Sequence, residues 1–201
     1  MLTIGLTGPS GAGKGVISSL FARFGVPSID TDAVYHRLLI PPSACLDELV
    51  ERFGPSIRKA DGTLDRPGLA SIVFAPGHEE DLRDLNRITH RHVLDEARRQ
   101  LEVHRDAGKA AVLVDAPQLF ESGFDAECDF VVAVLASRQT RMERIMARDG
   151  LDSARAIARM DAQKSDDFFR EHADAVLVND GEIEDLEDEI RDLLRRWEVL
   201  S

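Results

Sequence analysis

The chain has few of the residues that mark secreted or membrane-embedded proteins. Its 201 residues include two cysteines, Cys45 and Cys128, without metal-ligand spacing, which argues against a disulfide framework and suits a reducing compartment. No apolar run approaches the ~18 residues of a membrane span, and residues 1–7 lack the basic and long apolar parts of a signal peptide. We therefore expect one compact, cytoplasmic, globular protein that does not contact membranes.

Positive charge is also scarce. The formal net charge is -12, which argues against a general nucleic-acid or membrane-surface binder, because both need excess Lys and Arg. The charge is uneven, however. Residues 180–198 hold nine acids and three arginines, whereas residues 137–164 hold six arginines and one lysine against four acids. An acidic protein has thus kept one basic segment, which we call the basic segment below.

Apolar, β-branched runs alternate with helical patterns along much of the chain. Runs of this kind without polar alternation are typical of strands buried on both faces of a parallel sheet. We predict an α/β fold with a P-loop NTPase-like parallel sheet flanked by helices. The candidate strands are residues 2–7, 26–29, 110–114, 130–135 and 173–178.

Residues 43–105 show helical stretches broken by Gly and Pro pairs, without strand-like alternation. This pattern predicts a helical insertion on the α/β frame. The expected division is a nucleotide-binding core of residues 1–42, 106–136 and 172–201, a helical acceptor-binding region of residues 43–105, and a helical lid of residues 137–171.

A glycine loop follows the first strand and opens a helix. Gly8 to Lys14 fit the G-x-x-x-x-G-K pattern in the strand-to-helix context that it requires. Backbone N–H groups in such a loop converge on phosphate oxygens, the helix N-terminus adds partial positive charge, and the lysine adds a full one. The pattern predicts ATP binding at Gly8, Gly11, Ala12, Gly13, Lys14, Gly15 and Val16.

The residues after Lys14 depart from the pattern. A Ser or Thr normally follows the lysine and reaches Mg²⁺, but Gly15 and Val16 stand here. Because Mg²⁺ keeps several waters and is held largely through phosphates and a carboxylate, we expect a wetter magnesium site. Asp32 or Asp115 would hold the ion through water, and no direct protein ligand is predicted.

Asp30 and Asp32 follow the second candidate strand, at the edge where open α/β sheets bind ligands. Phosphoryl transfer needs a group that orients or deprotonates the attacking hydroxyl. We predict that Asp32 is this catalytic base, working beside Lys14. Helix capping by Thr31 or Asp32 is the structural alternative.

Several segments together resemble dephospho-CoA kinases, in order and spacing, over nearly the whole chain. The glycine loop is widespread, but the combination of D-G-x-L-x-R with P-x-L-F-E is more particular. The matching segments are residues 4–8, 29–32, 53–54, 61–66, 88–90, 117–121, 139–148, 163, 174 and 179, with Leu69 and Phe74.

The resemblance implies an ATP-dependent kinase that phosphorylates the ribose 3′-hydroxyl of dephospho-CoA in the last step of coenzyme A synthesis. It also implies that the second Asp of the pair, Asp32 here, is the base. From the matched segments we take His90, Pro117 and Leu119 as acceptor-binding candidates. Arg66 joins them because its guanidinium fork matches phosphate oxygens.

The chain departs from the family pattern at three places. Arg91 stands where the family usually has Pro, Gln118 where it usually has Leu, and Gly15-Val16 where it usually has Ser-Thr. A changed acceptor is therefore a second hypothesis, such as a nucleoside monophosphate or another small molecule. A third is an ATP-binding protein without catalysis.

The basic segment predicts a phosphate-facing helix. Arg141, Arg144 and Arg148 follow one another at i, i+3 and i+7, which places them on one helix face. A lid carrying that face could exclude water and neutralise charge during transfer. We predict a catalytic role for Arg141, nucleotide binding by Arg148, and an adenine contact at Asn179; a solvated surface face is the alternative.

Overall fold

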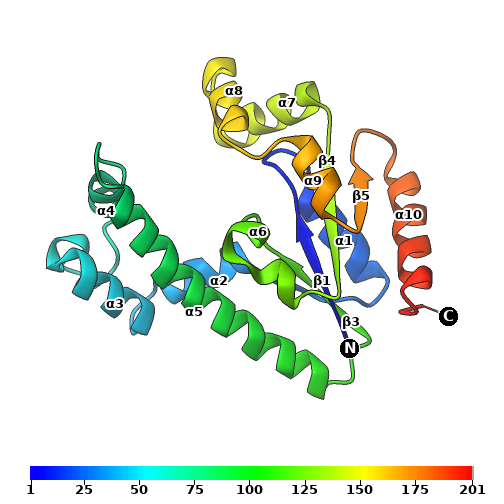
Figure 1. The fold of residues 1–201 in the computed structure, drawn as a ribbon, viewed down its shortest axis with the longest axis horizontal. Helices are drawn as coiled ribbons and strands as arrows, with labels where there is room; N and C mark the ends of the chain where they lie inside the picture. Colours follow the sequence, from blue (N-terminus) through cyan, green and yellow to red (C-terminus); the bar gives the residue numbers. More distant parts are fainter. Residues whose placement is uncertain (201) are drawn as a thin grey trace. The chain divides into compact units, whose positions relative to one another are not determined.

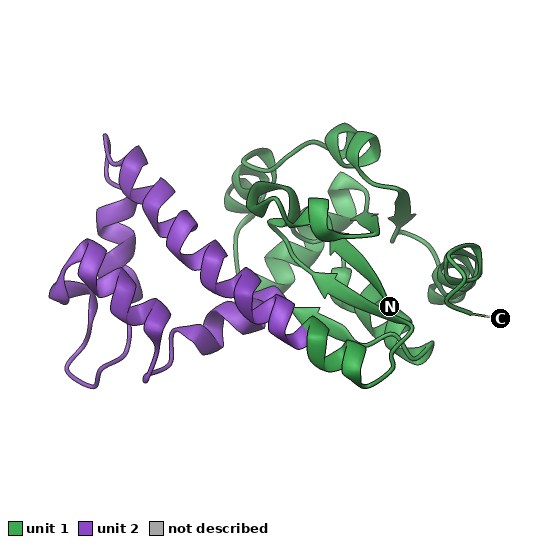
Figure 2. Cartoon of the chain, turned by 60° about the horizontal axis from the view of Figure 1, so that its bottom comes forward, with its two compact units in different colours: residues 1–30, 101–201 green, residues 31–100 purple. Residues whose placement is uncertain are grey.

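The computed structural model describes residues 1–200, which form two compact units (Figure 2). Unit 1 combines Met1–Asp30 with the chain from Leu101 onward, and unit 2 is Thr31–Gln100. Unit 2 overlaps the helical region expected at residues 43–105 but begins earlier, at the end of the second strand. None of the described helices is both long and apolar enough to cross a membrane.

A five-stranded sheet forms the centre of unit 1, in the order β2-β3-β1-β4-β5, and every neighbouring pair is parallel. The inner strands are almost wholly buried, as their unbroken apolar runs predict. The predicted parallel α/β architecture is confirmed. The strands are β1 (Leu2–Thr7), β2 (Ser28–Asp30), β3 (Ala111–Asp115), β4 (Phe130–Leu135) and β5 (Ala175–Val178).

Helices cover both faces of this sheet (Figure 1). Helices α1 (Lys14–Arg23) and α10 (Ile183–Arg196) bury their apolar stripes against strand residues such as Ile4 and Leu113. On strand β4 the alternate residues, Ala133 and Leu135, pack instead with α9 (Asp166–His172) and with Phe120 of the short helix α6 (Leu119–Ser122). Because neighbouring residues of a strand face opposite ways, the sheet is buried on both sides.

The basic segment supplies two further helices to unit 1, α7 (Arg138–Asp149) and α8 (Ser153–Asp161). Ser137 and Asp152 begin them as N-caps, accepting hydrogen bonds from the backbone N–H groups of Thr140 and Arg155. A small apolar cluster that includes Ile145, Ala156 and Met160 joins the two helices. A short 3₁₀ turn, η2 (Phe124–Glu127), completes the connection between α6 and β4.

Unit 2 is helical, and its described residues contain no strand. An apolar cluster that includes Leu46, Leu49, Ile57 and Leu69 forms its core. Helix α5 continues past Gln100, so its last turn belongs to unit 1. The helices are α2 (Thr31–Leu38), α3 (Ala44–Phe53), α4 (Arg66–Val73) and α5 (Glu79–Asp106), with a 3₁₀ turn η1 at Pro55–Ile57.

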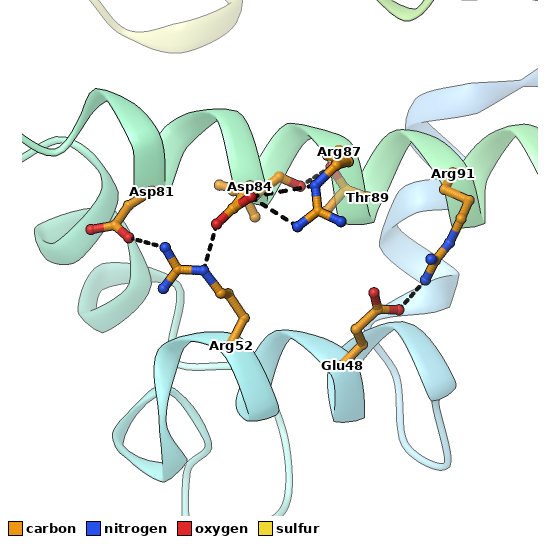
Figure 3. Close-up of polar contacts among 8 residues, drawn as sticks. Glu48, Arg52, Asp81, Asp84, Arg87, Thr89 and Arg91 are labelled. Atoms are coloured by element: carbon orange, nitrogen blue, oxygen red, sulfur yellow. Dashed lines mark hydrogen bonds and ion pairs between the residues drawn. The ribbon is translucent and has the colours of Figure 1, made fainter.

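Charged side chains connect α3 to α5 across the surface of unit 2 (Figure 3). Arg52 donates to Asp81 and to Asp84, at 2.6 Å each. Glu48 accepts from Arg91 and lies 2.9 Å from His92 Nε2. Arg91, which replaces the proline usual in the resembling family, therefore lies within a continuous helix and pairs with α3.

Candidate active site

The glycine loop of unit 1 joins β1 to α1 as the sequence predicts, and its glycines are required by the conformation. Gly8 has φ 141°, and a Cβ there would lie 2.2 Å from the Val134 carbonyl oxygen. Gly13 has φ 94°, and a Cβ there would lie 2.1 Å from Asn179 Nδ2. Neither position has the space or the backbone angles for a side chain.

The backbone N–H groups at the start of α1 can bind an anion. Gly13 is the N-cap of α1 and has no side chain to bond the N–H groups of the first turn. Those groups and the helix dipole attract phosphate oxygens. Lys14 Nζ lies 3.4 Å from the carbonyl oxygen of Gly8, which places its charge over the loop.

Arginines of α7 donate hydrogen bonds to the carbonyl oxygens of the loop. Arg141 Nε donates to the Ser10 carbonyl at 3.1 Å. Arg144 Nη1 donates to the carbonyls of Gly11 and Ala12, at 3.3 and 3.2 Å. The predicted basic face is confirmed as a shared face, and two of its arginines bond the carbonyl oxygens of the loop.

Arg141 is only 6% exposed, and this burial lowers the pKa of its guanidinium. Its second partner is Asp166, the first residue of α9, at 3.1 Å. Arg148 is mainly exposed; the Asp149 carboxylate beside it raises the pKa of Arg148, which also donates to Ser10 Oγ at 3.3 Å.

Ser10 is bonded through all three of its polar groups. Its N–H donates to Gln163 Oε1 at 2.9 Å, its carbonyl accepts from Arg141, and its hydroxyl accepts from Arg148. All three partners come from residues 138–163. The basic segment is therefore attached to the phosphate loop most densely at Ser10, in addition to the bonds of Arg144 to Gly11 and Ala12.

Asn179 follows β5 and is 5% exposed. Its Nδ2 donates to the Ala12 carbonyl at 2.8 Å, and its own carbonyl accepts from Arg144 at 3.1 Å. This places Asn179 against the loop, where it supports Ala12. Its adenine contact stays a prediction.

Asp115 ends β3 at the carboxyl edge of the sheet, in register with Leu6 of β1 and with Asp30 of β2. Ser18 of α1 donates to Asp115 Oδ2 at 3.3 Å. Among the described residues no group of three or more His, Cys, Asp or Glu could cage a metal ion. A single carboxylate beside a phosphate loop nevertheless fits Mg²⁺, which takes one or two carboxylates, phosphate oxygens and waters.

Asp32, Arg66 and His90 belong to unit 2. Asp32 is the second residue of α2, directly after β2 ends at Asp30. Arg66 begins α4, and its Nη2 donates to His36 Nδ1 at 2.6 Å, so this imidazole nitrogen is the acceptor. His90 lies in the middle of α5. Their roles stay predictions.

Pro117 and Leu119 follow β3 in unit 1. Leu119 is fully buried, and a Cβ on Gly5 would meet its side chain at 2.8 Å, so it packs beneath the central strand. Pro117 is half-buried, and Gln118, which replaces the usual Leu, is exposed before α6. Substrate contacts by Pro117 and Leu119 stay predictions.

Sequence reasoning did not identify the roles of Ser10, Ser18, Gln163 or the carbonyl-bound Arg144. Ser10 and Gln163 are 153 residues apart in the sequence, and no local pattern reports such a bond. Ser18 had a usable signal, because it lies four residues after Lys14 and so shares its helix face. Arg144 was placed on the correct face, but its partners were not predicted.

Comparisons with known proteins agree on one family. The family model for dephospho-CoA kinase matches residues 2–185. A dephospho-CoA kinase from Bacillus cereus is 35% identical over 201 residues, covering 100% of this chain and 99% of that protein.

Two solved structures extend the likeness to the fold. A crystal structure from Thermus thermophilus has a TM-score of 0.79 at 32% identity and covers 97% of each chain. Dephospho-CoA kinase from Campylobacter jejuni has a TM-score of 0.68 at 25% identity, covering 96% of this chain and 95% of that one.

Proposed function

The chain belongs to the dephospho-CoA kinase family, and from this premise we propose that it transfers the γ-phosphate of ATP to the ribose 3′-hydroxyl of dephospho-CoA. The observation that carries the proposal is the glycine loop, with Gly13 at the start of α1 and Lys14 over the loop, in a chain that matches the family along residues 2–185. The products are ADP and coenzyme A.

The transfer needs an attacking oxygen, a phosphate acceptor and a place for one proton. In the proposed reaction the 3′-hydroxyl oxygen bonds to the γ-phosphorus while the bond to the β–γ bridging oxygen breaks. The hydroxyl proton goes to the Asp32 carboxylate, and ADP carries away the electron pair of the broken bond. Lys14 and the loop N–H groups bind the β- and γ-phosphate oxygens as their charge redistributes.

The side chains that bond the loop carbonyls hold the loop in position for the nucleotide. Arg144 and Asn179 bind the loop carbonyls, which leaves the opposite N–H groups of the loop directed to the phosphates. Arg148, exposed at the edge of the loop, is the proposed nucleotide-binding cation. Direct contact between Arg141 and the transferring phosphate stays a prediction, since its donors bond Ser10 and Asp166 here.

We propose Mg²⁺ as the metal, with Asp115 or Asp32 holding it through water. When bound, the ion would neutralise charge on the phosphate oxygens. The residues that surround Asp115 fit that requirement, as its carboxylate lies at the strand end next to α1.

The proposed acceptor region is unit 2. Arg66 is exposed and fits a phosphate of the acceptor, while His36 holds one edge of its guanidinium. His90 of unit 2 stays an acceptor-binding prediction, as do Pro117 and Leu119 of unit 1. The net charge of -12 supports small-molecule substrates over nucleic acid, and the free thiols of Cys45 and Cys128 suit a cytoplasmic setting.

The direct test is CoA formation from ATP, dephospho-CoA and Mg²⁺, followed by mass spectrometry. Lys14→Ala is expected to lower kcat/KM by removing charge from the phosphates, and Asp32→Asn to lower kcat by about 100-fold or more while ATP binding persists. Glu51→Gln, an exposed change on α3, is the matched control and should retain activity.

Tight ATP binding by the natural chain without any CoA would contradict the proposal. Turnover of a nucleoside monophosphate in place of dephospho-CoA would move the chain to the changed-acceptor hypothesis. Full activity of Asp32→Asn would reject Asp32 as the base and leave the overall reaction standing.

A further inference from the structure

The first turn of α1 lacks the hydroxyl that a glycine loop of this kind normally directs to magnesium. Gly15 takes its position, and a Cβ built there would meet nothing within 4 Å. Val16, next in the chain, is apolar and 39% exposed. The space for a hydroxyl is therefore open, and neither residue provides one.

A hydroxyl does occur one turn later on the same helix face. Ser18 follows Gly15 by three residues and Lys14 by four, the spacings that place side chains on a common face. Its Oγ lies 3.3 Å from Asp115 Oδ2, at the carboxyl end of β3. Helix α1 and strand β3 thus form a hydroxyl–carboxylate pair, and its hydroxyl lies on the same helix face as Gly15.

The neighbouring serine behaves differently. Ser19 Oγ donates to the Gly15 carbonyl at 2.8 Å, within its own helix. Such back-bonding is the ordinary arrangement for a helical serine. Ser18 instead reaches outward to the strand-end carboxylate, so the two hydroxyls of one helix have separate partners.

Distance decides what kind of ligand Ser18 can be. A magnesium–water distance of ~2.1 Å plus a hydrogen bond of ~2.8 Å spans ~5 Å, which is close to the ~4.5 Å rise of the three helical residues from Gly15 to Ser18. A hydroxyl displaced by nearly one turn is too far for direct coordination at the usual ion position. It is at the right range to bind a water that the ion carries.

We propose that Ser18 and Asp115 form a water-mediated magnesium site that replaces the hydroxyl missing at Gly15. The inference rests on the proposed use of ATP with Mg²⁺. Asp115 accepts hydrogen bonds from metal-bound waters, and Ser18 orients that carboxylate and accepts from a water in turn. The metal remains more hydrated than in a loop that ends in Lys-Ser or Lys-Thr.

The test is a metal titration of the full chain with a non-hydrolysable ATP analogue, using Mn²⁺ as the probe and electron paramagnetic resonance as the readout. Ser18→Ala is expected to weaken Mn²⁺ binding to the protein–nucleotide complex by about 10-fold, the scale of one hydrogen bond to a charged group. Ser19→Ala, the adjacent control, should leave it unchanged. Circular dichroism confirms that each variant is folded.

A double-mutant cycle with Gly15→Ser separates the site from a structural role. Gly15→Ser fits the open space and should tighten Mn²⁺ binding and displace a metal-bound water, because it restores the direct ligand. Ser18→Ala should then have little further effect in the Gly15→Ser background. Loss of the Ser18 effect in this background supports the proposal.

Two results would overturn it: equal Mn²⁺ affinities for Ser18→Ala and Ser19→Ala, or the same Ser18 effect with and without Gly15→Ser. The titration does not depend on dephospho-CoA. If the variants show the expected Mn²⁺ affinities but the chain forms no CoA, dephospho-CoA would be rejected as the acceptor while the proposed metal site would stand.

Discussion

Arg141 in unit 1 and the arginines that join α3 to α5 in unit 2 have opposite environments. In unit 1, Arg141 is 6% exposed and bonds a loop carbonyl together with Asp166. In unit 2, the Arg52 and Arg91 side chains are 36% and 53% exposed and pair with carboxylates of a neighbouring helix. These arginines make similar numbers of hydrogen bonds, but water reaches Arg52 and Arg91 far more readily than it reaches Arg141.

This difference determines what each arginine contributes. A buried guanidinium that loses its partners cannot exchange them for water, so each of its bonds matters to stability and to the shape of the loop. An exposed pair gives up water to form and regains it on breaking, so its net value is small. Arg141 of unit 1 sets the geometry of the loop, whereas Arg52 and Arg91 of unit 2 connect the surfaces of two helices.

The largest expected effect comes from Arg141→Ala. Removing this side chain leaves the Ser10 carbonyl and Asp166 without their donor and opens a cavity beneath the loop, at a cost of about 2–3 kcal/mol in the free energy of unfolding. Urea denaturation of the full chain measures this cost. Arg52→Ala, the exposed counterpart, should shift the urea midpoint much less. Equal shifts would contradict the conclusion that burial makes the bonds of Arg141 worth more to stability than those of Arg52.

Arg144→Ala should change nucleotide affinity more than stability. The side chain donates to the carbonyls of Gly11, Ala12 and Asn179, and without it the loop samples arrangements that do not bind phosphates. We expect ATP affinity to fall about 10-fold, as for loss of one or two hydrogen bonds to a charged group. Calorimetric titration with ATP provides the measurement, and Arg138→Ala on the same helix, exposed and paired with Asp161, serves as the control.

The smallest effect concerns Glu48 in unit 2. Its hydrogen bond with His92, with help from Arg91, holds the pKa of the Glu48 carboxyl below its ordinary value of 4.5. A lowered folded pKa stabilises the protein above about pH 4.5 and loses that contribution as the pH falls through the folded value. Glu48→Gln should therefore cost about 0.5–1 kcal/mol at pH 7 and progressively less toward pH 3.

Urea denaturation at pH 7, 5 and 3.5 tests this sign. Glu51→Gln, an exposed change on the same helix, is the control variant. A Glu48→Gln cost that persists unchanged at pH 3.5 would show that the pair contributes through packing, in conflict with the comparison drawn between the units.

The sheet was largely predictable from local sequence. The unbroken apolar runs gave β1 and β4 with their observed bounds, because a strand buried on both faces leaves a composition signal. The bounds of helix α5 were harder to predict from the sequence. Its 28 residues appeared as part of several helical stretches, since no local signal marks a helix that runs from one unit into the other.

The residue types of the candidate site were predictable from the sequence, but their hydrogen-bond partners were not. The glycine pattern identified the loop, and helical spacing placed Arg141, Arg144 and Arg148 on one face. Neither pattern could show that two of these arginines bond loop carbonyls, because backbone partners arise only from the tertiary fold. The bonds of Gln163 and Ser18 are missing from the sequence prediction for the same reason.

The attachment of the basic segment at Ser10 has a consequence for how that segment and the nucleotide affect each other. The free energy with which Gln163, Arg141 and Arg148 favour one shape of the loop is shared with whatever ligand favours that shape. By linkage, a ligand that tightens the loop must tighten the segment by the same factor. Residues 138–163 and the phosphate-binding loop are then one thermodynamic unit, joined through Ser10 and through the bonds of Arg144 to Gly11 and Ala12, so the order of the segment reports on occupancy of the loop.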